Sequence, residues 1–175
     1  MRHTQDAPHL QHIASANDMA LHAAQASQRI MRNLRPAILD QGLIPSIQWL
    51  AQDFEKRTAA RATVYASSED MHLSADVMLT AYRTAQEALT NASKYAAGSE
   101  VRIDISDIGG TLTVEIADQG PGLEAHALKK AASFGLRGLS ERAKSVGGWL
   151  DISSVPRKGT SITLTIPLET STAAP

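Results

Sequence analysis

The sequence predicts an α+β fold, a two-layer sandwich in which helices cover one face of a mixed β-sheet, preceded by a long N-terminal helix. Three observations predict it. The first half of the chain is rich in helix-forming residues. The second half contains paired segments in which apolar and polar residues alternate. Glycine-bearing turns separate these segments, so the strands pair into hairpins whose buried face requires a covering layer of helices.

The composition is that of an ordinary soluble protein. The 175 residues suit one domain plus an appendage, with 43% hydrophobic and 20% charged residues. A formal net charge of -1 gives no electrostatic case for binding nucleic acid or an anionic membrane. The absence of cysteine excludes disulfides, thiolate zinc sites and a cysteine nucleophile.

The chain contains no apolar run near the roughly 20 residues that a membrane span needs, and no signal peptide. We therefore expect no membrane span in this chain. The expected location is the cytoplasm, either as a free protein or as the cytoplasmic part of a membrane-anchored receptor.

A long helix is predicted from about His9 to Leu34, where the sequence lacks glycine and proline. Its residues at 3–4 spacing include small and polar ones, so the helix is too weakly apolar to be stable alone. We interpret it as one helix of a bundle whose other members belong to a second chain or lie outside this sequence. A lone surface helix is the alternative.

A break at Pro36 separates this helix from the expected main domain. We expect residues 1–35 to contribute this helix, residues 36–168 to form the main domain, and residues 169–175 to form a tail. The main domain would begin with a helix from about Pro45 to Ala60, and its apolar face consists of Ile47, Leu50, Ala51 and Phe54.

A short strand at Ala62–Ala66 precedes the central helix, which Ser74 and Asp76 can cap. The segment Tyr82–Ala97 lacks internal glycine and proline. Small side chains along one face would let the helix lie close to a sheet: Ala81, Ala85, Ala88, Ala92 and Ala96.

A polar stripe runs beside the alanines on the surface of this helix, and it consists of Glu87, Asn91, Lys94 and Tyr95. An acid, an amide and a lysine on one face are the groups that a magnesium–triphosphate site would use. The alternative is the solvated face of an ordinary amphipathic helix.

The second half predicts two hairpins with a helix between them. Val101–Ile105 and Leu112–Ile116 alternate around the turn Gly109-Gly110. The helix Leu139–Val146 would end at Gly147 in a left-handed conformation. The second hairpin would comprise Trp149–Val155, a turn at Pro156–Gly159, and Ser161–Ile166.

Three glycine-bearing segments could bind a nucleotide. The first, Asp118-Gln-Gly120-Pro-Gly122, follows a strand, and its glycines let the backbone approach a flat ligand. The Asp118 carboxylate can accept a hydrogen bond from an exocyclic amine, so adenine would fit where guanine would not. Gly135-x-x-Gly138 opens a helix whose free N–H groups suit phosphate. Gly159-Thr160-Ser161 begins the last strand. Taken alone, each segment is more simply explained as a turn or a helix start.

The order of these motifs resembles that of the GHKL (Bergerat-fold) ATP-binding domains. Within them the chain is most similar to the catalytic domain of sensor histidine kinases of the nitrate-sensor/DegS-like subfamily. The resemblance covers roughly Leu34 to Leu168, and its most specific segments are Leu34–Leu43, Glu87–Ala96 and Gly135–Ala143.

The resemblance implies binding of ATP and Mg²⁺. Asn91 would ligate the metal, Glu87 would act as the base or orient the metal's water, and Lys94 would reach phosphate. Asp118 would bind the adenine N6, and Thr160 a water beside the same ring. Further nucleotide-binding residues would be Tyr95, Gly120, Gly122, Gly135, Leu136, Arg137 and Gly138. The chain departs from the family at Gln119, where Asn is frequent, and at Tyr95, where His is frequent.

The phosphoacceptor histidine of this subfamily is followed directly by an acidic residue. None of the six histidines meets this criterion: His3, His9, His12, His22, His72 and His126. His22 lies in the middle of the predicted N-terminal helix, where an exposed helix histidine is the simpler interpretation. We therefore expect the chain to start after the acceptor helix and to retain only the second helix of the dimerisation and phosphotransfer hairpin, in residues 1–35. It should bind Mg-ATP and not phosphorylate itself.

The partners implied are a response regulator, the acceptor-histidine helix of the full-length protein, and a second copy in a homodimer. Two other functions remain open: a serine kinase of the anti-sigma-factor type on the same fold, and a degenerate nucleotide-sensing or dimerisation module without activity. The Leu34–Leu43 segment and the helix before it argue against the first of these functions. The intact Glu87, Asn91, Asp118 and glycines argue against the second.

Overall fold

A computed structural model describes residue 19 and residues 35–68, 71–122 and 136–168. Contacts divide the chain after Ala37, and the unit that starts at Ile38 carries the fold described below. The expected helix from His9 to Leu34 and the tail lie outside the described residues, apart from Met19. The boundaries expected for the three regions of the chain therefore stay predictions.

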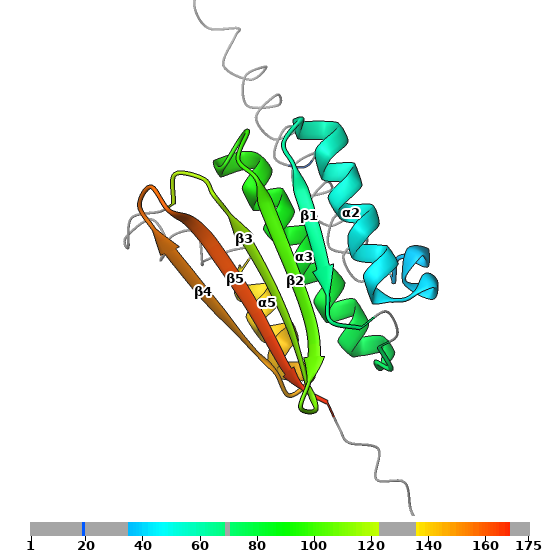
Figure 1. Cartoon of the computed structure of the whole chain (residues 1–175). Coiled ribbons are helices and arrows are strands. Elements are labelled where there is room, and N and C mark those ends of the chain that lie inside the picture. The colour runs from blue at the N-terminus through cyan, green and yellow to red at the C-terminus, as the bar shows by residue number, and fades with distance from the viewer. Residues whose placement is uncertain (1–18, 20–34, 69–70, 123–135, 169–175) are drawn as a thin grey trace, which may run out of the picture. The chain divides into compact units, whose positions relative to one another are not determined.

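The sheet is mixed, as the sequence predicts. Its five strands lie in the order β1-β2-β3-β5-β4 (Figure 1). β1 pairs with β2 in parallel, and every other pair is antiparallel. The strands are β1 (Ala62–Ala66), β2 (Val101–Ile108), β3 (Thr111–Asp118), β4 (Trp149–Val155) and β5 (Gly159–Pro167).

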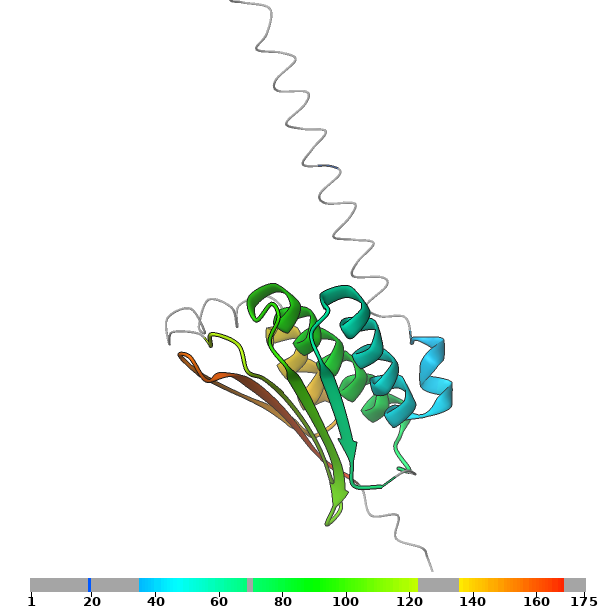
Figure 2. The same cartoon turned by 45° about the horizontal axis from the view of Figure 1, so that its top comes forward.

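In the described part of the chain, three α-helices lie on one face of this sheet, which completes the predicted two layers (Figure 2). They are α2 (Leu43–Thr58), α3 (Ala75–Tyr95) and α5 (Arg137–Ser145). A short 3₁₀ helix that the sequence analysis did not predict, η1 (Ala37–Gln41), precedes them.

The ends of α2 differ from the prediction by two residues. The helix begins at Leu43, before Pro45, and ends before Ala59, which adopts a left-handed conformation with φ of 57°. The buried Ser46 hydroxyl lies 2.9 Å from the carbonyl oxygen of Ile38, which joins η1 to the first turn of α2. These local contacts, which apolar periodicity does not report, set the start of the helix.

The central helix α3 begins where the sequence predicts. Ser74 caps it by accepting a hydrogen bond of 3.3 Å from the Val77 backbone N–H, and Asp76 lies in the first turn. The five alanines predicted to face the sheet are all buried. Their small side chains allow the close approach of helix and sheet, so this prediction is confirmed.

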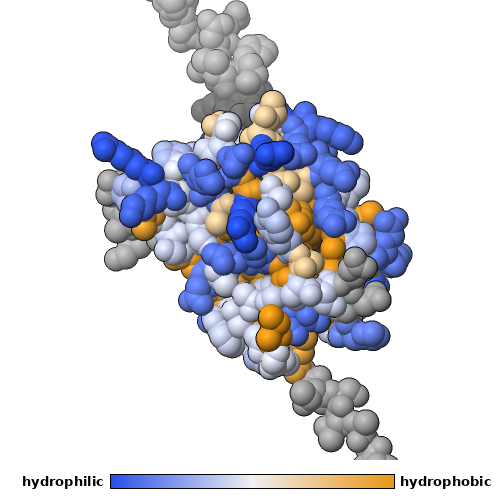
Figure 3. Space-filling view, in the orientation of Figure 1, coloured by the Kyte–Doolittle hydropathy of each residue, from blue (hydrophilic) through white to orange (hydrophobic). Residues whose placement is uncertain are grey.

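The two faces of the sheet differ in polarity. The face beneath the helices carries rows of apolar side chains from neighbouring strands, such as Ile103, Ile116, Ile162 and Ile152. The opposite face, seen in Figure 3, is mostly hydrophilic. The core therefore lies between the sheet and the helices.

The first hairpin is confirmed and longer than predicted, with Gly109 and Gly110 at φ of 64° and 70° in its turn. The predicted turn of the second hairpin is wrong by one residue. Val155 pairs with Gly159, so Gly159 belongs to β5 and the turn contains only three residues, 156–158. Helix α5 starts at Arg137 rather than Leu139, and Gly147 has the expected positive φ, 75°.

Candidate functional site

One row of side chains interrupts the apolar surface beneath the helices. Asp118 on β3 lies directly opposite Thr160 on β5, and Thr160 lies directly opposite Ser154 on β4. The next row along the strands is apolar, with Ile116 opposite Ile162. Polar groups therefore gather at one end of the core-facing side of the sheet, where β3 ends.

Backbone groups hold the Asp118 carboxylate on one of its two oxygens. Asp118 Oδ1 accepts hydrogen bonds from the Gly120 N–H, at 2.9 Å, and from the Thr160 N–H, at 3.3 Å. The other oxygen, Oδ2, has no hydrogen-bond partner among the described residues. The carboxylate is thus oriented by the fold and keeps one oxygen with which to accept a hydrogen bond from a ligand.

Glycines bring three distant segments together at this row. A Cβ on Gly120 would overlap the Cβ of Ala96, just beyond α3. A Cβ on Gly122, whose φ is 66°, would overlap the carbonyl oxygen of Val155. A Cβ on Gly159, whose φ is 91°, would overlap the carbonyl oxygen of Asp118.

These contacts refine the interpretation of the glycines. The sequence analysis assigned Gly120 and Gly122 to the close approach of a ligand, whereas the structure requires them for contacts within the protein. The Arg157 N–H also donates to the Pro121 carbonyl at 2.6 Å, which ties the turn after β3 to the turn between β4 and β5.

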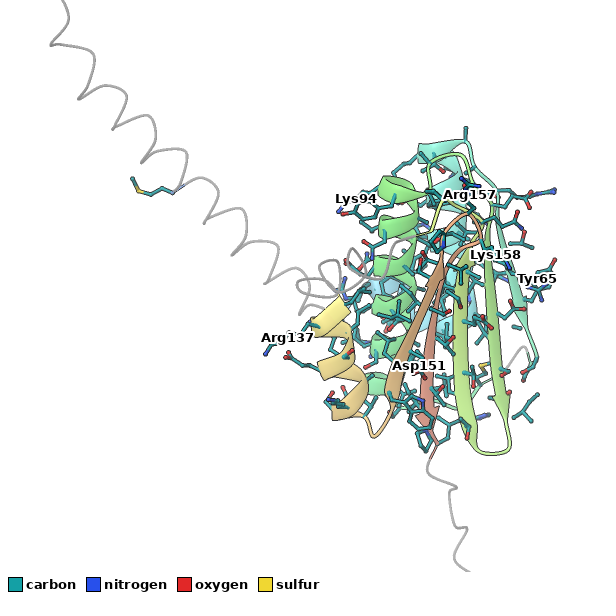
Figure 4. The ribbon with its side chains drawn as sticks, turned by 90° about the vertical axis from the view of Figure 1, so that its left-hand side faces the viewer. Tyr65, Lys94, Arg137, Asp151, Arg157 and Lys158 are labelled. Carbon is teal, nitrogen blue, oxygen red and sulfur yellow. The ribbon has the colours of Figure 1, made fainter. Side chains whose placement is uncertain are left out.

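The polar stripe of α3 is partly exposed in the described part of the chain. Glu87 and Asn91 lie one helical turn apart and are partly buried, whereas Lys94 and Tyr95 are exposed. The side chains of Glu87, Asn91 and Lys94 make no hydrogen bond to another described residue. Figure 4 shows Lys94 pointing away from the sheet, at the same end of the molecule as Arg157.

The start of α5 carries three further expected residues. Leu136 is buried. Arg137 points away from the sheet, and its Nε lies 3.2 Å from Glu141 Oε1 on the same helix (Figure 4). No described heavy atom lies within 4 Å of a Cβ built on Gly138. Gly135 lies outside the described residues.

The structure therefore brings together Asp118, Gly120, Gly122 and Thr160 beside the end of α3. It also adds Ser154, which the sequence analysis did not select, and gives Gly159 of the third glycine-bearing segment a packing role against Asp118. The correct hairpin register, with Val155 opposite Gly159, would have placed Ser154 beside Thr160. The predicted four-residue turn shifted the pairing of β4 with β5 by one residue, so Ser154 was not expected opposite Thr160.

The chemistry of the polar groups fits a nucleotide with a hard cation. Carboxylate and amide oxygens such as those of Glu87 and Asn91 suit Mg²⁺. The described residues contain no group of three or more His, Cys, Asp or Glu side chains that could hold a metal ion. Magnesium commonly binds through one or two protein oxygens together with the phosphates of a substrate, so this donor set is sufficient.

No helix in the described part of the chain combines the length and the apolar composition that crossing a membrane requires.

Comparison with protein families and curated proteins gives consistent results. Residues 77–170, a little over half of the chain, match the family described as histidine kinase-, DNA gyrase B- and HSP90-like ATPases. The chain is 33% identical over 162 residues to the signal transduction histidine-protein kinase/phosphatase DegS of Brevibacillus brevis. This alignment covers 92% of the chain but only 42% of that relative.

Solved structures show the same fold. A blue-light activated histidine kinase of Erythrobacter litoralis aligns with a TM-score of 0.63 and 21% identity, over 75% of this chain and 43% of that one. The mycobacterial sensor histidine kinase MprB aligns with a TM-score of 0.56 and 19% identity, over 70% of this chain and 91% of that one. At these identities the likeness shows the fold alone.

Proposed function

The chain belongs to the histidine kinase-, DNA gyrase B- and HSP90-like ATPase family, and on that premise we propose that it is the ATP-binding catalytic region of a two-component sensor histidine kinase. The identity of 33% to a histidine-protein kinase over 92% of the chain supports this member of the family over the others. The chain spans less than half of that relative, so the activity of the whole protein is part of this proposal.

The observation that carries the proposal is the arrangement around Asp118. One of its oxygens is held by the Gly120 and Thr160 N–H groups, and the other is available to accept from the N6 amine of adenine. Gly120 packs on Ala96, at the end of the helix that bears Glu87 and Asn91. This contact supports the proposal that the group that would read the base and the groups that would bind phosphates and metal border one site.

In this proposal Asn91 ligates Mg²⁺, and Glu87 acts as the base or orients the metal's water. The phosphates lie near Lys94, Tyr95 and the segment Gly135, Leu136, Arg137 and Gly138. Thr160 holds a water beside adenine. Bound Mg²⁺ would neutralise phosphate charge, and phosphoryl transfer depends mainly on such neutralisation and on positioning.

The phosphoryl group would pass to a histidine outside this chain and then to a response regulator. The acceptor helix and a second copy of the protein would be the other partners. None of the histidines of this chain is assigned as the acceptor, because none is followed by an acidic residue.

Two measurements test the proposal. Calorimetry with ADP and ATP, with and without Mg²⁺, should detect binding of adenine nucleotides that magnesium strengthens. Labelled ATP should then transfer phosphate to a separately supplied helical hairpin that carries a histidine followed by an acid. Absence of nucleotide binding by the folded protein would overturn the proposal. Transfer to a serine of an anti-sigma antagonist instead would favour the serine-kinase alternative.

A further inference from the structure

The edge strand β4 contributes one polar side chain to the row that contains Asp118. Ser154 Oγ lies 2.8 Å from Thr160 Oγ1 and donates to the Gly159 carbonyl at 3.3 Å. Ser154 and Thr160 are directly opposite in the β4–β5 pairing, and both are partly buried. The hydroxyl of Ser154 therefore contacts both residues with which β5 begins.

We propose that Ser154 is a positioning residue for adenine recognition, acting through the hydroxyl of Thr160. The inference rests on the proposed function, in which Thr160 holds a water beside the base. Thr160 then has two tasks: its N–H orients Asp118 Oδ1, and its hydroxyl orients the water. Ser154 is the residue that determines where that hydroxyl lies.

The physical reason is the rotational freedom of a threonine hydroxyl. Threonine has more than one accessible χ1 rotamer, and its hydroxyl hydrogen rotates to suit its partners. A hydrogen bond to Ser154 favours the rotamer in which Oγ1 lies along the cross-strand row. Whichever oxygen donates, the bond restrains Oγ1 before the nucleotide arrives, so less freedom is lost on binding.

Residues on the same strand distinguish this role from simple stabilisation of the hairpin. Ser153, next to Ser154, is exposed on the opposite face of the sheet and lies opposite Ser161. A serine-to-alanine change there alters the same strand and removes the same chemical group without touching Thr160. It is therefore the matched control.

The first experiment measures ADP binding by calorimetry, together with the thermal unfolding midpoint of each variant. Ser154→Ala should weaken ADP binding about fivefold, within the range expected for the loss of one hydrogen bond. Ser154→Thr, which retains a hydroxyl, and Ser153→Ala should bind like the wild type. The preference for ADP over inosine diphosphate, which lacks the 6-amino group, should fall in Ser154→Ala only.

A double-mutant cycle with Thr160→Val decides whether Ser154 acts through Thr160. The double variant should bind ADP no more weakly than Thr160→Val alone. The inference would be overturned if the two changes weakened ADP binding additively, or if Ser154→Ala bound ADP as tightly as the wild type. It would also be overturned if Ser154→Thr bound ADP as weakly as Ser154→Ala, or if Ser154→Ala lost as much affinity for inosine diphosphate as for ADP. Failure of the wild type to bind ADP would instead overturn the proposed function.

Discussion

Gly120 lies against Ala96 so closely that a Cβ on the glycine would overlap the alanine Cβ. The two residues belong to different motifs of the sequence, since one follows β3 and the other ends the alanine-lined face of α3. Their contact joins the turn that carries Asp118 to the helix that carries Asn91. The spacing between the two halves of the proposed nucleotide site therefore depends on two small side chains.

Gly120→Ala should destabilise the protein and weaken nucleotide binding. The added methyl group would also lie 3.0 Å from the Ala96 backbone Cα, so the helix end or the turn must move. Overpacking of this kind costs about 1–3 kcal/mol in the free energy of unfolding, measurable by urea denaturation. Gly138→Ala provides the contrast, because no described atom lies near its Cβ position. The free energy of unfolding of Gly138→Ala should therefore stay close to that of the wild type. Equal stabilities for the two variants would contradict the packing argument.

Asp118→Asn should separate stability from base recognition. The asparagine Oδ1 can still accept from the N–H groups of Gly120 and Thr160, so the unfolding midpoint should stay near that of the wild type. The second position becomes an NH₂ donor facing the adenine amine, and ADP affinity should fall at least about tenfold. Asp118→Ala should lose both stability and affinity. An Asn variant that binds ADP normally would remove Asp118 from adenine recognition.

Asn91→Ala should abolish the magnesium-dependent part of ATP binding and leave the circular dichroism spectrum unchanged. The Asn91 side chain makes no hydrogen bond to a described residue, so its removal leaves no protein partner unpaired. The measurement is calorimetry with and without Mg²⁺. If Mg²⁺ strengthened ATP binding by Asn91→Ala as much as by the wild type, Asn91 would have no metal-binding role.

Glu87→Gln should retain nucleotide binding and stop phosphoryl transfer. The change is nearly isosteric, and Glu87 makes no hydrogen bond to a described residue that the amide would disturb. The amide cannot accept a proton as a base, so transfer to an added acceptor hairpin should fall to background. Labelled ATP and a time course measure this. Normal transfer rates in Glu87→Gln would exclude Glu87 from the mechanism.

Local chemistry accounts for the parts of the fold that the sequence predicts well. The turn Gly109-Gly110 predicts its hairpin because both residues adopt positive φ, which glycine tolerates. Ser74 predicts the start of α3 because a serine side chain can cap nearby N–H groups. The ends of α2 and the helix η1 were not predicted, because they depend on contacts such as that of Ser46 with Ile38.

By itself, the sequence determined the α+β class, the alanine face and polar stripe of α3, and the position of Asp118 at the end of a strand. These features follow from periodicities of 3.6 and 2 residues and from the chemistry of single residues. Only the tertiary structure decided that Asp118, Thr160 and Ser154 share one cross-strand row and that Gly120 packs on Ala96. Strand register and the packing of distant segments arise from non-local hydrogen bonds and steric fit, and a one-residue error in a turn changes every pair that follows it.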